Sequence, residues 1–221
     1  MANPPPALPP IDSLQTADDD TLKTVLDLLF EPSSTLHDLS IPRIRDRVRE
    51  LQGPSASTLT YAALIQDVGS LLGSLASQSA SSPSSRATLH AILGSHPRLG
   101  EKKVASAQSR AEQAQLNASS SSSSPSSSST PAEEQKRQEE EAATERQLLA
   151  DLNAEYEARF PGLRYVVFVN GRARPAILAN MRERIARGDP AAEEREAISA
   201  MVEIALDRAR KLGGGGGEGL R

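Results

Sequence analysis

Residues Thr58–Ala76, TLTYAALIQDVGSLLGSLA, decide the fold class because they carry one apolar stripe at helical spacing. Apolar side chains three or four positions apart lie on one face of an α-helix, and such a face is normally buried against a partner. We therefore predict a helix here that packs inside a helical domain. Its stripe consists of Tyr61, Leu64, Ile65, Val68, Leu72 and Leu75.

The N-terminal segments repeat this pattern twice. A first helix is expected after an N-cap at Thr16, with the acidic run Asp18-Asp19-Asp20 in its first turn, where carboxylates favour the helix dipole. A second helix is expected to begin near Ser40, because Pro42 is tolerated in a first turn but not in a helix interior. The two stripes are Leu22, Val25, Leu26 and Leu29, and then Ile41, Ile44, Val48 and Leu51.

Two shorter helices are predicted in the middle of the chain. One carries Leu89, Ile92 and Leu93 and ends at Gly94, because the residue before Pro97 is pushed out of the helical region. The other spans Lys102–Leu116 and is expected to pack closely through an alanine-rich face. That face consists of Val104, Ala107, Ala111 and Ala114.

The C-terminal part adds three predicted helices and one extended segment. A charged, solvated stretch, Glu133–Glu145, leads into core positions that start at Leu148, and Pro175 and Asp189-Pro190 open the last two helices. Leu163–Val169, LRYVVFV, is the one strand-like segment, and it has no sheet to join. The sequence therefore predicts an all-α, single-domain helical bundle of about seven to eight helices with one buried extended segment.

The length of 221 residues fits one domain with flexible additions. The domain is expected to span residues 8–212, between a flexible N-terminus, 1–7, and a Gly-rich flexible tail, 213–221. A Ser-rich stretch, 118–131, interrupts it. This stretch is predicted to be a disordered insertion, because it cannot bury enough apolar area to offset its ordering entropy.

Composition excludes several function classes. The net charge of −4 provides no broad cationic field, so nucleic acid is not an expected partner. The absence of cysteine rules out disulfides, thiolate metal sites and cysteine nucleophiles. With only three histidines and no phosphate-binding or metalloprotease motif, neither a metal nor a cofactor is expected.

The sequence also indicates where the protein acts. No apolar run approaches 18 residues, and the Pro-rich start lacks the features of a secretory signal, so no membrane association is expected. We expect an intracellular protein, cytoplasmic or peroxisomal. The ending Gly219-Leu220-Arg221 is not a peroxisomal address of the Ser-Lys-Leu type.

The loop Gly94–Lys102, GSHPRLGEK, holds the candidate for chemistry. A histidine fixed before a proline and between two glycines presents its imidazole from a rigid turn, with a pKa near neutrality that suits acid–base work. On these residues alone, however, a histidine such as His96 in a helix-terminating turn is more often a cap or a surface residue.

Several motifs, taken in order, resemble the ureidoimidazoline decarboxylases of urate degradation. The central pair is His96-Pro97-x-Leu99-Gly100-x-Lys102 followed by Ser109-x-x-Glu112-Gln113. Further matches are the opening Leu8–Leu14, Leu28-Leu29-Phe30-Glu31, Leu152-Asn153-x-x-Tyr156 with Phe160, and Arg172-x-Arg174-x-Ala176-Ile177-Leu178. Together they span nearly the whole chain apart from the Ser-rich stretch and the tail.

The resemblance implies a cofactor-free carboxy-lyase acting on 2-oxo-4-hydroxy-4-carboxy-5-ureidoimidazoline (OHCU), a small anionic heterocycle, to give (S)-allantoin. It implies that His96 is the catalytic acid or base and that Glu112 orients it or polarises the substrate. Pro97 would line the substrate site, and Gln113 would hydrogen-bond the ureido group or the ring amide. Related helical domains pair, so a homodimer is left open.

One position departs from the family pattern. Many members carry a carboxylate-binding arginine after the extended segment, where this chain has Asn170. An amide cannot form the charge-assisted bidentate pair of an arginine. Arg172, Arg174 or Arg98 could substitute for it. The departure keeps an alternative open, a catalytically impaired helical binding module of the same fold. A coiled-coil protein built on Glu133–Phe160 is disfavoured, since the apolar repeat is too short.

Overall fold

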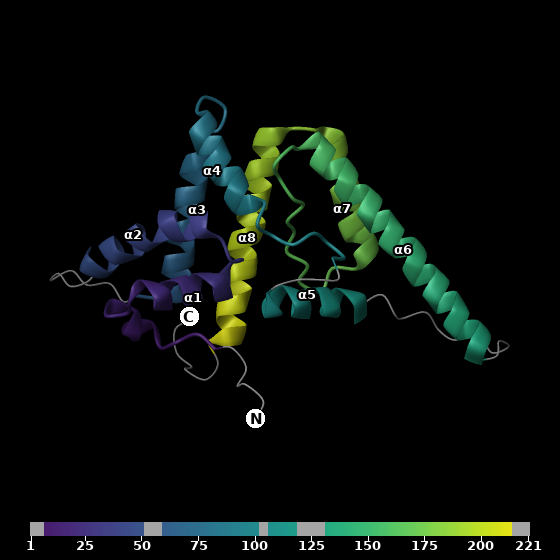
Figure 1. Ribbon diagram of the computed structural model, residues 1–221, viewed down its shortest axis with the longest axis horizontal. Coiled ribbons are helices and arrows are strands. Elements are labelled where there is room, and N and C mark those ends of the chain that lie inside the picture. Colours follow the sequence, from purple (N-terminus) through teal and green to yellow (C-terminus); the bar gives the residue numbers. More distant parts are fainter. Residues whose placement is uncertain (1–6, 51–58, 102–105, 119–130, 214–221) are drawn as a thin grey trace.

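The protein is all-α. A computed structural model describes residues 7–50, 59–101, 106–118 and 131–213. Over these residues the chain forms eight α-helices and one 3₁₀ helix and contains no strand, as predicted (Figure 1). In order they are η1 (Ile11–Gln15), α1 (Asp19–Leu29), α2 (Ser34–Glu50), α3 (Tyr61–Gln78), α4 (Pro83–Leu93), α5 (Ala107–Ala118), α6 (Pro131–Arg159), α7 (Arg174–Arg187) and α8 (Pro190–Leu212).

Helix α8 is the central element. It lies between α1–α4 on one side and α5–α7 on the other in Figure 1, and it packs against α3 and α1. Its apolar face is buried, with Met201, Ile204 and Ala205 at 5% exposure or less. Asp189 caps the start of the helix, where its carboxylate accepts from the N–H groups of Ala191 and Ala192, and the helix ends at Leu212, as the sequence indicates. The backbone N–H of Leu8 donates to Leu212 O (3.2 Å), which ties the start of the described chain to the end of α8.

The first two helices begin at other residues than predicted. Asp18, not Thr16, caps α1 by accepting from the Thr21 N–H (2.8 Å), while Thr16 closes the preceding 3₁₀ turn. Helix α2 begins at Ser34 instead of Ser40, so Pro42 lies in its interior. The buried positions of α2 explain this, because they continue at helical spacing through the proline and their packing outweighs one lost backbone hydrogen bond. They are Leu36, Ser40, Ile44 and Val48.

The strand-like segment Leu163–Val169 joins no sheet and has no regular secondary structure. It runs along α8 toward α5 in Figure 1, with Tyr165 and Val166 buried. The Arg184 guanidinium donates to Val166 O (3.0 Å), and the Tyr165 hydroxyl donates to Asn180 Oδ1 (2.8 Å). The first of these bonds satisfies a backbone carbonyl that a neighbouring strand would otherwise pair. Both bonds fix the chain that leads into the candidate site.

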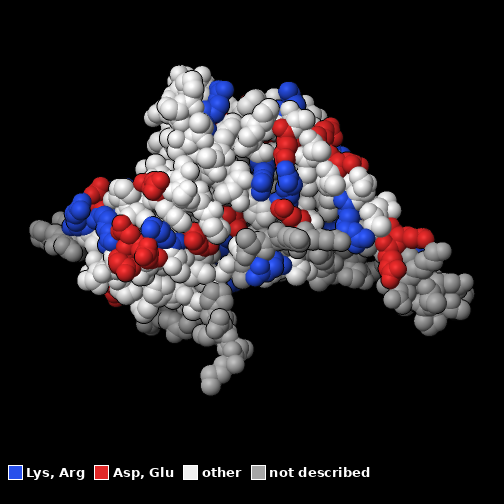
Figure 2. Space-filling view, viewed as in Figure 1, with Lys and Arg blue, Asp and Glu red and all other residues white. Residues whose placement is uncertain are grey.

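Charges on the surface are mixed. Figure 2 shows basic and acidic side chains interspersed over the visible face, so the net charge of −4 is not gathered into one field there. Within the part of the chain that the structure describes, no helix combines the length and the apolar character that a membrane span requires. The predicted segments 1–7, 118–131 and 213–221 lie almost entirely outside the described residues.

Candidate functional site

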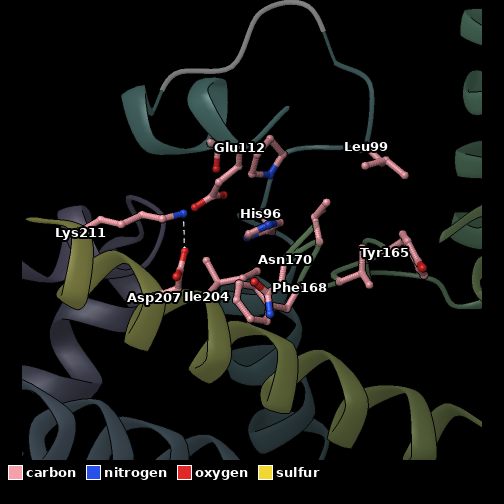
Figure 3. A pocket seen from close by; sticks show the side chains of 13 residues that line it. His96, Leu99, Glu112, Tyr165, Phe168, Asn170, Ile204, Asp207 and Lys211 are labelled. Carbon is pink, nitrogen blue, oxygen red and sulfur yellow. Dashed lines mark ion pairs between the residues drawn. The ribbon is translucent and has the colours of Figure 1, made fainter. Parts of the chain in front are cut away.

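A cavity of about 80 Å³ lies where four segments meet: the loop after α4, helix α5, the extended segment and the last turns of α8. About 10–15 Å³ of such space holds one water, so the cavity has room for several waters or a small ligand. Apolar walls alternate with a few polar groups, as is usual for small-molecule sites (Figure 3). The lining residues are His96, Pro97, Leu99, Ser109, Glu112, Tyr165, Val167, Phe168, Val169, Asn170, Ile204, Asp207 and Lys211.

The loop that carries His96 is held rigidly from both ends. At its start Arg164 donates to the carbonyl of His96 (2.9 Å). Further along, the buried amide of Asn153 donates to Leu99 O (3.0 Å), and Arg98 forms a bidentate pair with Glu157 (2.5 and 2.8 Å). Asn153 and Glu157 both lie on α6, so the loop is attached to that helix at two points. The stiff turn inferred from the glycine and proline pattern is therefore present.

Gly100 completes the loop in a left-handed conformation (φ 81°), and a Cβ there would lie 2.8 Å from the Leu149 side chain. Gly171 has a similar backbone (φ 71°) but open space around it. We expect Gly100→Ala to lower the free energy of unfolding by about 1–3 kcal/mol more than Gly171→Ala, because only the former overpacks its surroundings. Urea denaturation of both variants measures the difference. Equal losses would contradict the close packing of the loop on α6.

His96 is half-buried and lies among the side chains that line the cavity (Figure 3). Burial lowers the pKa of its imidazole to about 4, and the positive charges of Arg208 and Arg164 act in the same direction, against the opposing effect of Glu112. The expectation of a pKa near neutrality is therefore not met. His96 is a neutral imidazole at physiological pH, able to accept a proton on one nitrogen and donate a hydrogen bond from the other.

The lowered pKa of His96 has a consequence for stability. Between about pH 4 and pH 6.5 the unfolded chain binds a proton at this histidine and the folded chain does not. Stability from this group is therefore present above pH 6.5 and is lost as the pH falls toward 4, by up to about 1.4 kcal/mol per pH unit. Urea denaturation across this range should show a steeper pH dependence for the wild type than for His96→Asn. Parallel curves would contradict the lowered pKa of His96.

Glu112 is held by a buried arginine on α8. Both of its carboxylate oxygens accept from Arg208 (2.8 and 2.9 Å). The same guanidinium donates to the carbonyl of Phe30 and to Glu31 (both 2.8 Å), and Arg208 is only 2% exposed. Ser109 joins this cluster by donating to Glu31 (2.5 Å). Charge-assisted bonds of this kind fix orientation, so Arg208 sets the direction in which Glu112 faces the cavity.

The inward face of α5 is polar, which differs from the alanine face predicted. Ala111 and Ala114 are exposed, whereas Ser109 is buried and Glu112 half-buried. Exposing an alanine side chain costs little free energy. Ser109 and Glu112, in contrast, form charge-assisted hydrogen bonds with the buried Arg208 only when they face inward. The helix begins at Ala107, and the predicted start at Lys102 falls in residues 102–105, which the structure does not describe.

The structure brings most of the predicted site residues together. His96, Pro97, Glu112 and Asn170 all line the cavity. The backbone of Gln113 belongs to α5, but its side chain lies outside the described residues. Arg172 is exposed and is not part of the lining.

The other two arginines considered as substitutes have acidic partners elsewhere. Arg98 pairs with Glu157, and Arg174 is buried and pairs with Glu145 (2.5 Å). Neither belongs to the cavity lining.

The backbone conformation at Asn170 favours an asparagine at this position. Asn170 is the one non-glycine residue with positive φ (35°) among those described, and it forms a turn with Gly171 in which Arg172 N–H donates to Val169 O (2.7 Å). Asparagine tolerates this left-handed backbone far better than a long branched or charged side chain does. The turn therefore explains why an asparagine is favoured at this position.

Sequence reasoning missed Arg208, Glu31, Asp207 and Lys211. A signal for Arg208 exists, because it continues the apolar stripe of α8 at the spacing Met201, Ala205, Arg208, and a charge on a buried stripe needs a partner. Its partner Glu31 lies 177 residues away, so no local pattern identifies the pair. Asp207 and Lys211 are ordinary residues of a charged helix end and gain meaning only from the cavity beside them.

One comparison with known proteins identifies a family for this chain. The family model of the OHCU decarboxylases matches residues 15–126 and 118–210, and the two matches meet within the Ser-rich stretch. No curated protein and no solved structure matches the chain significantly. The family match covers well over half of the chain and includes the His96 loop, the Glu112 helix and the Arg208 helix, so the chain belongs to the OHCU decarboxylase family.

Proposed function

We propose that the protein decarboxylates 2-oxo-4-hydroxy-4-carboxy-5-ureidoimidazoline to (S)-allantoin in urate degradation, without a cofactor. The observation that carries the proposal is the placement of His96 and Glu112 in the lining of one cavity, within a chain of the OHCU decarboxylase family. The substrate supplies its own electron sink. When the bond to the carboxylate breaks, its electron pair can be delocalised into the neighbouring ring imine and carbonyl.

His96 acts as the proton-transfer group. Since its imidazole is neutral in the free protein, it can accept the proton of the substrate hydroxyl as CO₂ leaves. The resulting imidazolium then donates that proton to one face of the carbanion carbon, and a ring nitrogen takes the last proton from solvent. A positioned acid–base group of this kind typically contributes about 10²–10⁴-fold in rate.

Glu112 orients the substrate. A carboxylate only accepts hydrogen bonds, so it suits the N–H groups of the ureido substituent and the ring. Because both of its oxygens are already held by Arg208, it presents a fixed acceptor that needs no reorganisation when substrate binds. Val167, Phe168 and Ile204 complete an apolar wall that limits water near the carbanion.

The test is to generate the unstable substrate in situ from urate and to follow the circular dichroism of allantoin and the release of CO₂ with and without the protein. Faster CO₂ release and one-handed allantoin are the expected results. An unchanged rate with racemic product would refute the activity.

A second candidate is a binding module that has lost efficient turnover. One observation favours it, the exposed position of Arg172 outside the cavity lining. The resemblance adds that Asn170 stands where the family pattern has a carboxylate-binding arginine. Fold alone does not decide between the two functions. The same assay separates them, because a module that only binds the substrate leaves both the rate and the handedness of the product unchanged.

A further inference from the structure

The last two turns of α8 contribute an acid and a base to the cavity. Asp207 and Lys211 both line it, and their ion pair joins Lys211 Nζ to Asp207 Oδ2 over 2.6 Å. They lie one helical turn apart, on the face that also presents Ile204. In Figure 3 the Lys211 side chain reaches along the edge of the cavity, with its ammonium between Glu112 and Asp207 in that view. The side chain is 57% exposed, so a ligand can reach it from solvent.

The negative charges that line the cavity disfavour an anionic ligand unless a cation such as Lys211 lies nearby. Two carboxylates, Glu112 and Asp207, line it, and His96 is neutral. A carboxylate ligand entering beside them is repelled unless a positive group offsets them.

Arg208 cannot provide this positive charge. It is 2% exposed, and each of its three guanidinium nitrogens already donates to a protein acceptor. Of the lysines and arginines in the described part of the chain, Lys211 is the one in the cavity lining.

We propose that Lys211 binds the substrate carboxylate in this protein and that Asp207 holds its ammonium at the cavity edge. This rests on the proposed function. An ammonium has three N–H donors, so it can donate to Asp207 and to a second carboxylate at the same time. The ammonium of lysine acts as a point charge, whereas the guanidinium of arginine binds a carboxylate through two parallel hydrogen bonds.

The weaker binding by an ammonium suits the substrate carboxylate, because this group leaves as CO₂ during the reaction. During decarboxylation negative charge moves from the carboxylate into the ring, so a strong contact to the carboxylate stabilises the ground state more than the transition state. Lys211 therefore contributes to substrate binding and little to the chemical step. Loss of an interaction that is no stronger in the transition state raises KM and does not lower kcat.

The experiment compares Lys211→Met with Arg210→Met in the in situ assay. Arg210 is a matched control, because it also pairs with Asp207 (3.4 Å) and is exposed, but it does not line the cavity. We expect Lys211→Met to raise KM roughly tenfold, the effect of losing one charge-assisted hydrogen bond, with kcat within about threefold. Lys211→Arg should keep KM near the wild-type value. Equal KM values for Lys211→Met and Arg210→Met would overturn the proposal.

A binding measurement separates failure of this inference from failure of the proposed function. Orotate and uracil share a ring and differ by one carboxylate, and calorimetric titration compares their binding to the full chain without turnover. We expect orotate to bind the wild type roughly tenfold more tightly than uracil and to lose this preference in Lys211→Met. If the wild type shows no turnover but keeps this preference, only the proposed function fails. If orotate binds no better than uracil, or Lys211→Met keeps the preference, the carboxylate site is wrong.

Discussion

Replacing His96 with asparagine is expected to lower kcat for decarboxylation by about 10²–10⁴-fold while the fold is retained. Asparagine keeps a polar side chain of similar size, so it can still hydrogen-bond, but it cannot take up and return a proton at accessible pH. The loop itself is held through the carbonyl of His96 and through Leu99, which the substitution leaves in place. Steady-state kinetics in the in situ assay and far-ultraviolet circular dichroism measure the two properties.

His37→Asn is the matched control for this prediction. His37 on α2 is half-buried and pairs with Asp27 on α1 (2.7 Å). It does not line the cavity. Its replacement should leave kcat within about twofold, since no catalytic group is removed. If the two histidine variants keep equal activity, His96 has no role in proton transfer.

Replacing Arg208 with methionine is expected to lower the free energy of unfolding by about 3–5 kcal/mol, because it leaves buried carboxylates without their cation. Glu31 is 4% exposed and depends on the guanidinium, and Glu112 loses the partner of both its oxygens. Activity should fall as well, through the lost orientation of Glu112. Urea denaturation and steady-state kinetics measure the two effects.

A double variant distinguishes the structural and the functional role of Arg208. Arg208→Met with Glu31→Gln removes the charge left buried on Glu31, so part of the stability should return. Activity should not return, because Glu112 still lacks its guanidinium. Arg210→Met, on the exposed side of the same helix, serves as the control and should change stability by less than about 1 kcal/mol. A stability loss for Arg208→Met no larger than for Arg210→Met would contradict the buried cluster.

Helices could be predicted from the sequence because local rules govern them. Apolar spacing located α1, α3 and α4, and the prolines in the first turns of α7 and α8 marked where those helices begin. The misplaced start of α2 shows the limit of such rules. Its interior proline is tolerated because Leu36, Ile44 and Val48 are buried on both sides of it, and this tertiary packing is invisible in a local pattern.

The site was predictable only in part. Resemblance to the family identified His96, Pro97, Glu112 and Asn170, and these residues share the cavity. The cluster that orients Glu112 was not predictable, because Phe30, Glu31 and Arg208 meet across most of the length of the chain. The neutral state of His96 was not predictable either, since it follows from burial beside two cationic side chains.

The central claim is that His96 delivers a proton to one face of the carbanion formed in the cavity. The most direct measurement is the enantiomeric composition of allantoin formed in the first minutes of the in situ reaction in D₂O, by chiral chromatography with mass detection. For the wild type we predict a large excess of one enantiomer carrying deuterium at the new stereocentre, and for His96→Asn equal amounts of both. One-handed product from His96→Asn, formed at the wild-type rate, would contradict the claim.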